Sequence, residues 1–186
     1  MEPNDEMKRY VEAVRDKNLY RRSFVERYFS FQGVGVEVGV LFGDFSALLL
    51  ETLIPTRLYL VDPWFKFAIC RTTDAEDAFK YVSERFEDDH RVEVLRLISV
   101  DAVVKFKDES LDFVYIDGDH SFNSCTTDLR IWWPKVKKCG VMAGDDFCVN
   151  RKGQPFGTVQ AVKNFLANGG VCEEFHLYKD QFAMVK

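Results

Sequence analysis

The sequence YIDGDHSF, at residues 115–122, places two carboxylates and an imidazole directly after a strongly apolar segment. That segment, residues 111–116, has the length and the side chains of a buried strand. Charged groups are costly to bury unless something pairs with them, so Asp117, Asp119 and His120 either face solvent in a turn or hold a ligand. An imidazole with its ordinary pKa of about 6.5 is mostly neutral at pH 7 and can accept a proton there.

A second acidic pair, Asp145 and Asp146, follows another apolar segment, residues 141–143. If the two segments are neighbouring strands of one sheet, three carboxylates meet at one edge and repel each other unless a cation lies among them. Oxygen ligands favour Mg²⁺ or a similar hard ion over zinc. The alternative is that Asp145 and Asp146 form a solvated loop and that Asp117 caps a helix.

A glycine-rich segment, GVGVEVGVLFGDFS, begins at Gly33. Within it Glu37, Gly39 and Gly43 form the pattern E-x-G-x-x-x-G, with an acid near the end of a strand and two glycines around a turn. Gly39 would let a ligand approach the backbone, and Gly43 would let the following helix pack closely. A dinucleotide fingerprint that starts at Gly33 is disfavoured, because Val38 stands where its third glycine belongs.

Asp62 follows the next apolar segment, residues 57–61. A carboxylate at this position can accept hydrogen bonds from both hydroxyls of a ribose. The alternative is a tight turn in which Asp62 only caps the backbone. Four expected strand ends thus carry special residues, at 39–43, 62, 117–120 and 145–146.

The spacing of apolar residues predicts strands that alternate with helices. Helices are expected at 5–29, 46–53, 74–88, through Leu129 to Val136 and at 158–166, and strands at 34–40, 57–61, 92–100, 111–116, 141–143 and in a C-terminal hairpin about Lys179 and Asp180. We therefore predict an α/β, Rossmann-like doubly wound fold. Its sheet has seven mostly parallel strands, a C-terminal antiparallel hairpin and helices on both faces. Ligands of such sheets bind beyond the carboxyl ends of the strands.

The chain has 186 residues, which fits one domain, residues 31–186, preceded by an N-terminal helical cap, residues 1–30. Its net charge of −5 argues against nucleic acid or an anionic membrane as the main partner. Five scattered cysteines without a C-x-x-C pair indicate reduced thiols, and we expect a cytoplasmic protein without a signal peptide or membrane span. Homo-oligomer formation is left open by the sequence.

The turn from Glu37 to Gly43, followed by Asp62 and Pro63, resembles that of the class I S-adenosylmethionine-dependent methyltransferases. The resemblance implies that the glycine turn holds the methionine part of the cofactor and that Asp62 holds its ribose. Leu41 stands where the family often has a third glycine. The cofactor site predicted in this way consists of Glu37, Gly39, Gly43, Ser46, Asp62, Trp64, Asp101 and Asp117.

Roughly residues 33–147 are similar to the small metal-dependent O-methyltransferases related to macrocin-type sugar O-methyltransferases, and the motifs that carry the similarity lie in residues 111–147. The shared features are the D-G-D-H strand end, a W-W-P-like helical segment and a G-D-D strand end, although Cys139 replaces a glycine common in the family. The resemblance implies methyl transfer to a hydroxyl of a small acceptor, and a sugar is the expected acceptor. It also implies Asp117, Asp145 and Asp146 as ligands of Mg²⁺ or another hard cation, and His120, with Asp119 as the alternative, as the base.

Three other interpretations remain open. The acceptor could be a catechol rather than a sugar. Asp117-Gly118-Asp119 also suits a glycosyltransferase that holds a nucleotide sugar through a metal, but such an enzyme would not need the Glu37–Gly43 turn or Asp62. A non-enzymatic interaction module is disfavoured, because all the chemical positions are filled.

Overall fold

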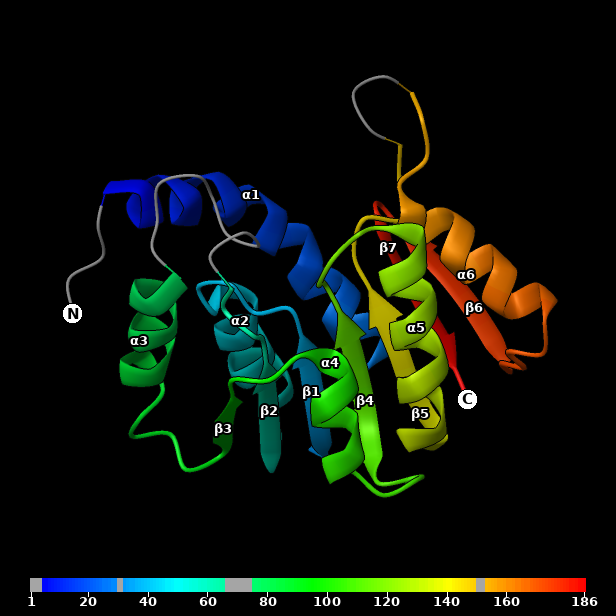
Figure 1. Cartoon of the computed structure of the whole chain (residues 1–186), viewed down its shortest axis with the longest axis horizontal. Helices are drawn as coiled ribbons and strands as arrows, with labels where there is room; N and C mark the ends of the chain where they lie inside the picture. Colours follow the sequence, from blue (N-terminus) through cyan, green and yellow to red (C-terminus); the bar gives the residue numbers. More distant parts are fainter. Residues whose placement is uncertain (1–4, 30–31, 66–74, 150–152) are drawn as a thin grey trace.

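The computed structural model describes residues 5–29, 32–65, 75–149 and 153–186, with side chains from residue 17 onward. These residues form a seven-stranded sheet in the order β3-β2-β1-β4-β5-β7-β6 (Figure 1). The strands are β1 (Val34–Val38), β2 (Arg57–Val61), β3 (Val92–Leu95), β4 (Leu111–Ile116), β5 (Val136–Gly144), β6 (Glu174–Tyr178) and β7 (Gln181–Val185). β1 to β5 pair in parallel, and β7 pairs antiparallel with β5 and β6. The predicted fold class is confirmed.

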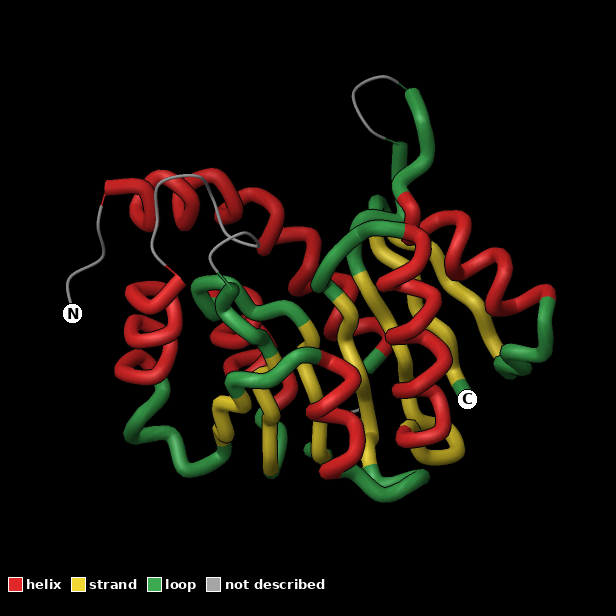
Figure 2. The backbone as a smooth tube through the Cα atoms, in the orientation of Figure 1, coloured by secondary structure: helices red, strands yellow, loops and turns green. Residues whose placement is uncertain are grey.

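Helices cover both faces of the sheet, as Figure 2 shows. They are α1 (Asp5–Tyr28), α2 (Asp44–Leu53), α3 (Ala75–Arg85), α4 (Ser99–Ala102), α5 (Phe122–Trp132) and α6 (Gly157–Ala167). Phe24, Leu49 and Val82 of α1, α2 and α3 belong to one hydrophobic core. Leu129 and Val162 of α5 and α6 belong to the other, together with Ala102 of α4.

The central strand β4 contributes to both cores because successive side chains of a strand point to opposite faces. Phe113 and Tyr115 pack with α1 and α2, while Val114 and Ile116 pack with α5 and α6. All four side chains are buried, and full burial of such a side chain contributes about 1.5–3 kcal/mol. The strand is therefore fixed on both sides, and its end at Asp117 is held in place.

Several predicted elements have other bounds in the structure: β1 ends at Val38, α3 ends at Arg85, and the largest differences concern β3, α5 and β5. The strand expected at 92–100 ends at Leu95, because the Leu97 N–H donates to the Leu95 carbonyl and turns the chain into α4. The helix expected to reach Val136 ends at Trp132, since Pro134 lacks the N–H that a continuing helix needs. A single-turn 3-10 helix, Trp133–Lys135, then leads into β5, which already begins at Val136.

The helix α1 runs across the edge of the sheet at which the parallel strands end (Figure 1). Its last part is anchored, because Phe24 and Val25 are fully buried in the core together with Phe29. The predicted boundary between a cap and the main domain, at residues 30 and 31, lies outside the described residues and stays a prediction. Among the described helices, none is long and apolar enough to cross a membrane.

The order of the strands reverses at β1. From β1 the chain continues to β2 and β3 on one side and then returns to β4 on the other side. This topological switch point is where open α/β sheets bind ligands. The turn after β1 and Asp117 after β4 meet there, because the Asp117 N–H donates to the Val38 carbonyl.

Candidate functional site

A cavity of about 960 Å³ lies at the carboxyl ends of β1, β2 and β4. Its size suits a ligand as large as a nucleoside derivative together with a small second molecule. Seven of the predicted site residues line it: Glu37, Gly39, Asp62, Asp117, Asp119, His120 and Asp146. The other five, Gly43, Ser46, Trp64, Asp101 and Asp145, are not part of its lining.

The turn after β1 depends on glycine at two positions. Gly39 has a φ of 90°, and a Cβ atom added there would lie 2.3 Å from the Asp117 carbonyl oxygen. Gly43 has a φ of 75°, and a Cβ atom there would lie 2.7 Å from the Phe86 ring. Leu41, at the position where the family often has glycine, also adopts a positive φ of 55°. The backbone therefore keeps the left-handed conformation that glycine favours even where the side chain differs.

Asp62 holds this turn through both of its carboxylate oxygens. Its Oδ2 atom accepts hydrogen bonds from the N–H groups of Val40 (2.9 Å) and Leu41 (3.1 Å), and its Oδ1 atom accepts one from Trp64 (2.7 Å). The capping role that the sequence left as an alternative is thus present. Asp62 also lines the cavity, and its contact with a ribose stays a prediction.

Glu37 is a buried acid, 1% exposed, at the floor of the cavity. The Ser46 hydroxyl donates a 2.5 Å hydrogen bond to its Oε2 atom. Burial raises the pKa of Glu37 to about 8, although the bond from Ser46 acts in the opposite direction. Glu37 is therefore mostly protonated at neutral pH and can donate as well as accept a hydrogen bond.

The raised pKa predicts how stability depends on pH. Because the folded state holds the Glu37 proton more tightly, this residue stabilises the fold fully below its unfolded pKa of 4.5, and the contribution is lost as pH rises through about 8. We expect Glu37→Gln to flatten the fall in unfolding temperature between these pH values and to be more stable than wild type above pH 8. Thermal unfolding from pH 5 to pH 9 measures this, and parallel curves for the two proteins would contradict it.

Trp64 and Asp101 occupy places other than the cavity wall. Trp64 is buried, packs against Phe79 with ring centroids 5.3 Å apart, and donates from Nε1 to the Leu41 carbonyl at 3.0 Å. Trp64 therefore supports the turn through Leu41 and does not line the cavity. Asp101 is exposed on α4, and Ser99 of the same helix lines the cavity instead.

Sequence reasoning missed Asp128, a buried acid of α5 that lines the cavity. Its Oδ1 atom accepts a hydrogen bond from the Ser99 hydroxyl, whose oxygen in turn accepts one from Trp132 Nε1 at 2.8 Å. Burial raises the pKa of Asp128 to about 6. The available signal was its spacing, since an acid three residues after Cys125 and one before Leu129 lies on the buried face of the helix.

The segment after β4 brings Asp117 and His120 together with Asp146. The ligand atoms of these three residues lie within 4.8 Å of one another, and His120 Nε2 is 3.0 Å from Asp146 Oδ2. Burial raises the pKa of Asp117 to about 6, against the lowering effect of Arg21. Carboxylate oxygens and an imidazole nitrogen are suitable donors for a divalent cation, so this set fits one chemically.

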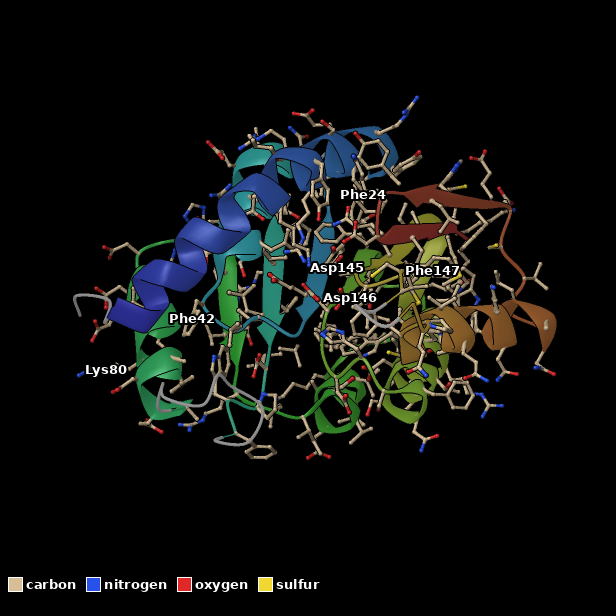
Figure 3. All side chains as sticks on the ribbon, turned by 90° about the horizontal axis from the view of Figure 1, so that it is seen from above. Phe24, Phe42, Lys80, Asp145, Asp146 and Phe147 are labelled. Atoms are coloured by element: carbon tan, nitrogen blue, oxygen red, sulfur yellow. The ribbon has the colours of Figure 1, made fainter. Side chains whose placement is uncertain are left out.

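Asp145, the remaining predicted metal ligand, is occupied by two cations from α1. Its Oδ2 atom forms ion pairs with Lys17 and Arg21, and the residue is 1% exposed. Burial opposes its ionisation, but the two cations outweigh burial and hold the pKa of Asp145 below its ordinary value. In Figure 3, Asp145 and Asp146 lie near the middle of the molecule, beside α1. The role of Asp145 as a metal ligand stays a prediction.

Arg21 links the two strand ends. Its Nη2 atom donates to Asp117 Oδ2 at 2.8 Å and also to Asp145, and its guanidinium lies 4.7 Å from the centre of the Phe45 ring. The sequence indicated a helix here but gave no sign of this contact. A single arginine of α1 therefore connects the ends of β4 and β5 beneath the helix.

Comparison with known proteins agrees with this architecture. Residues 36–147 match the family model described as a methyltransferase domain. No curated protein matches the chain.

Similar solved structures include the O-methyltransferase NovP, with 18% identity, a TM-score of 0.67 and coverage of 90% of this chain and 80% of that one. They also include an O-methyltransferase from Bacillus cereus in complex with SAH, with 18% identity, a TM-score of 0.64 and coverage of 99% and 92%. At such identities the structural likeness shows the fold, while the family match spans more than half of the chain. This protein therefore belongs to the methyltransferase-domain family and is a class I, S-adenosylmethionine-dependent methyltransferase.

Proposed function

We propose that the protein is an O-methyltransferase that transfers the methyl group of S-adenosylmethionine to a hydroxyl of a small acceptor. The observation that carries this proposal is that the glycine turn, Asp62 and the His120–Asp146 pair line one cavity. In this proposal the cofactor's methyl group and the His120 imidazole both face the acceptor molecule bound in the cavity. The O-methyltransferases among the structures of similar fold support the reaction class.

His120 is the better candidate for the base. Its Nε2 atom lies 3.0 Å from Asp146 Oδ2, so the carboxylate can orient the ring and stabilise the imidazolium that forms when the acceptor hydroxyl loses its proton. Asp119 is already engaged: it accepts hydrogen bonds from the Ser121 N–H, the Ser121 hydroxyl and the Ser124 hydroxyl. Asp119 therefore holds the start of α5.

A divalent cation such as Mg²⁺ would be held by Asp117, His120 and Asp146, with Asp145 added by the family resemblance. When bound, such an ion lowers the pKa of a coordinated hydroxyl. Because Nε2 of His120 faces Asp146, Nδ1 is the nitrogen that would accept a proton in the role of base. A neutral imidazole that coordinates an ion through Nε2 carries its proton on Nδ1 and cannot accept another there. The question of metal dependence therefore also decides whether His120 acts as base or as ligand.

The proposed acceptor is a sugar hydroxyl, on the basis of the resemblance to the macrocin-type enzymes, and a catechol is the second candidate. Both present neighbouring hydroxyls. The glycosyltransferase interpretation loses its support, because the chain belongs to a methyltransferase family. A screen of deoxysugar, glycoside and catechol acceptors, with release of S-adenosylhomocysteine as the readout, tests the reaction.

The cofactor part of the proposal is tested by calorimetric titration with S-adenosylmethionine. We expect Asp62→Ala to weaken this affinity by about 10- to 150-fold, because hydrogen bonds to a charged group contribute about 1.5–3 kcal/mol. Asp108→Ala is the control, since Asp108 is an exposed acid that pairs with Lys135 away from the cavity. Equal affinities for Asp62→Ala and wild type would refute the role of Asp62, and no binding by wild type would refute the proposed function.

A further inference from the structure

Arg21 is buried to an extent that is unusual for an arginine, with 5% of its surface exposed. It contacts Asp117 after β4 and Asp145 after β5. Asp117 belongs to the candidate metal cluster, and Asp145 precedes Asp146 of that cluster. Lys17, one helical turn earlier, joins it at Asp145. A buried arginine persists only where its charge is neutralised, so these contacts fix where α1 lies across the sheet edge.

The charges around these two strand ends nearly balance without any bound ion. Asp117, Asp145 and Asp146 contribute three negative charges, and Lys17 and Arg21 contribute two positive ones. The mutual repulsion of the three carboxylates, for which the sequence predicted a bound cation, is therefore largely removed by Lys17 and Arg21. The cations that remove it come from a helix distant in sequence, since 124 positions separate Arg21 from Asp145.

We infer that Arg21 is a built-in counter-ion that competes with a divalent cation for Asp117. The Asp117 carboxylate accepts a hydrogen bond from Arg21 and is also one of the three groups of the candidate metal cluster. A divalent ion bound there would lie close to the guanidinium and be repelled by it. Metal binding and the contact between α1 and Asp117 therefore oppose each other, and the wild-type protein binds metal weakly. The inference rests on the proposed cluster and does not depend on cofactor binding.

The test is the affinity of the full chain for Mn²⁺, measured by calorimetry and by electron paramagnetic resonance of the free ion. We expect Arg21→Gln to bind Mn²⁺ at least about tenfold more tightly than wild type, because one nearby positive charge is removed. Arg22→Gln is the matched control: Arg22 lies on the same helix but bonds Glu51 and Thr52 instead. This control is expected to bind Mn²⁺ as wild type does.

Two further variants keep the test decisive. Adding Asp117→Asn to Arg21→Gln is expected to cancel the gain, which would place the ion at Asp117. Lys17→Gln, at a more exposed position, is expected to give a smaller gain and serves if Arg21→Gln does not fold. Equal Mn²⁺ affinity in wild type, Arg21→Gln and Lys17→Gln would overturn the inference, whether all bind or none binds. Titration of the same proteins with S-adenosylmethionine in EDTA measures cofactor binding without metal. Absence of cofactor binding there would refute the proposed function and leave the result for Arg21 unaffected.

Discussion

Replacement of Gly39 by alanine is expected to abolish cofactor binding and to destabilise the protein by several kcal/mol. The new Cβ atom would lie 2.3 Å from the Asp117 carbonyl oxygen and 2.6 Å from the Gly118 nitrogen, both of which are backbone atoms that cannot rotate away. The positive φ costs about 1–3 kcal/mol for a residue other than glycine, and overpacking costs a similar amount. To avoid this collision, the turn after β1 must move away from the end of β4, and this movement distorts the cavity between them.

Gly169→Ala is the matched control for this prediction. Gly169 has a comparable φ of 100°, but nothing lies within 4 Å of its added Cβ atom, so the variant carries the backbone cost without the collision. Denaturant unfolding should show a much larger loss for Gly39→Ala, and calorimetry with S-adenosylmethionine should show lost binding for that variant alone. Similar losses of stability for the two variants would mean that the contact between Gly39 and Asp117 is not a tight one.

The sheet was most predictable where a parallel strand is a mainly apolar run with a polar stop, as β2 and β4 are. Residues 57–61 and 111–116 match β2 and β4 residue for residue, and the C-terminal hairpin turns at Lys179 and Asp180 as expected. Such runs are informative because a strand covered on both faces has no polar side. The ends of β3 and α5 were less predictable, since a single turn at Leu97 and one proline decided them.

The site was predictable only where its residues follow strands. Parallel strands all end at one edge, so Asp62, Asp117 and Asp146 could be placed together from their positions after apolar segments. The prediction of Asp101 as a site residue failed, because β3 ends at Leu95 and Asp101 lies exposed on α4. The ion pairs of Asp145 with Lys17 and Arg21 could not be predicted. The helix α1 carries many charges, and its sequence does not indicate which of them contacts a strand end more than 100 positions away.

Local hydrogen bonds also separate residues that look equivalent in sequence. Asp119 and His120 are neighbours in the D-G-D-H segment, and both were candidates for the base. In the structure Asp119 binds Ser121 and Ser124 at the start of α5, whereas His120 pairs with Asp146. Replacement of His120 is therefore expected to lower the rate of methyl transfer strongly, and replacement of Asp119 to change it little.

His120→Gln is expected to lower the rate of methyl transfer by about 10²–10⁴-fold, the usual contribution of a positioned proton acceptor. Glutamine retains a polar side chain but cannot take up the proton. Affinity for S-adenosylmethionine should stay within a few-fold of wild type, because the turn after β1 and Asp62 are untouched. Single-turnover release of S-adenosylhomocysteine, with the acceptor found in the screen, measures the rate.

Asp119→Asn is the control from the same segment. Its pKa is held low by the hydrogen bond from Ser124 and the bonds from Ser121, so it remains ionised and is a poor proton acceptor at neutral pH. We expect its rate to be within about tenfold of wild type, with a small loss of thermal stability from a weakened helix start. A large fall in rate for Asp119→Asn together with a small one for His120→Gln would assign the base to Asp119. Comparable large falls for both would indicate that the segment after β4 acts as one hydrogen-bonded unit in which neither residue can be changed alone.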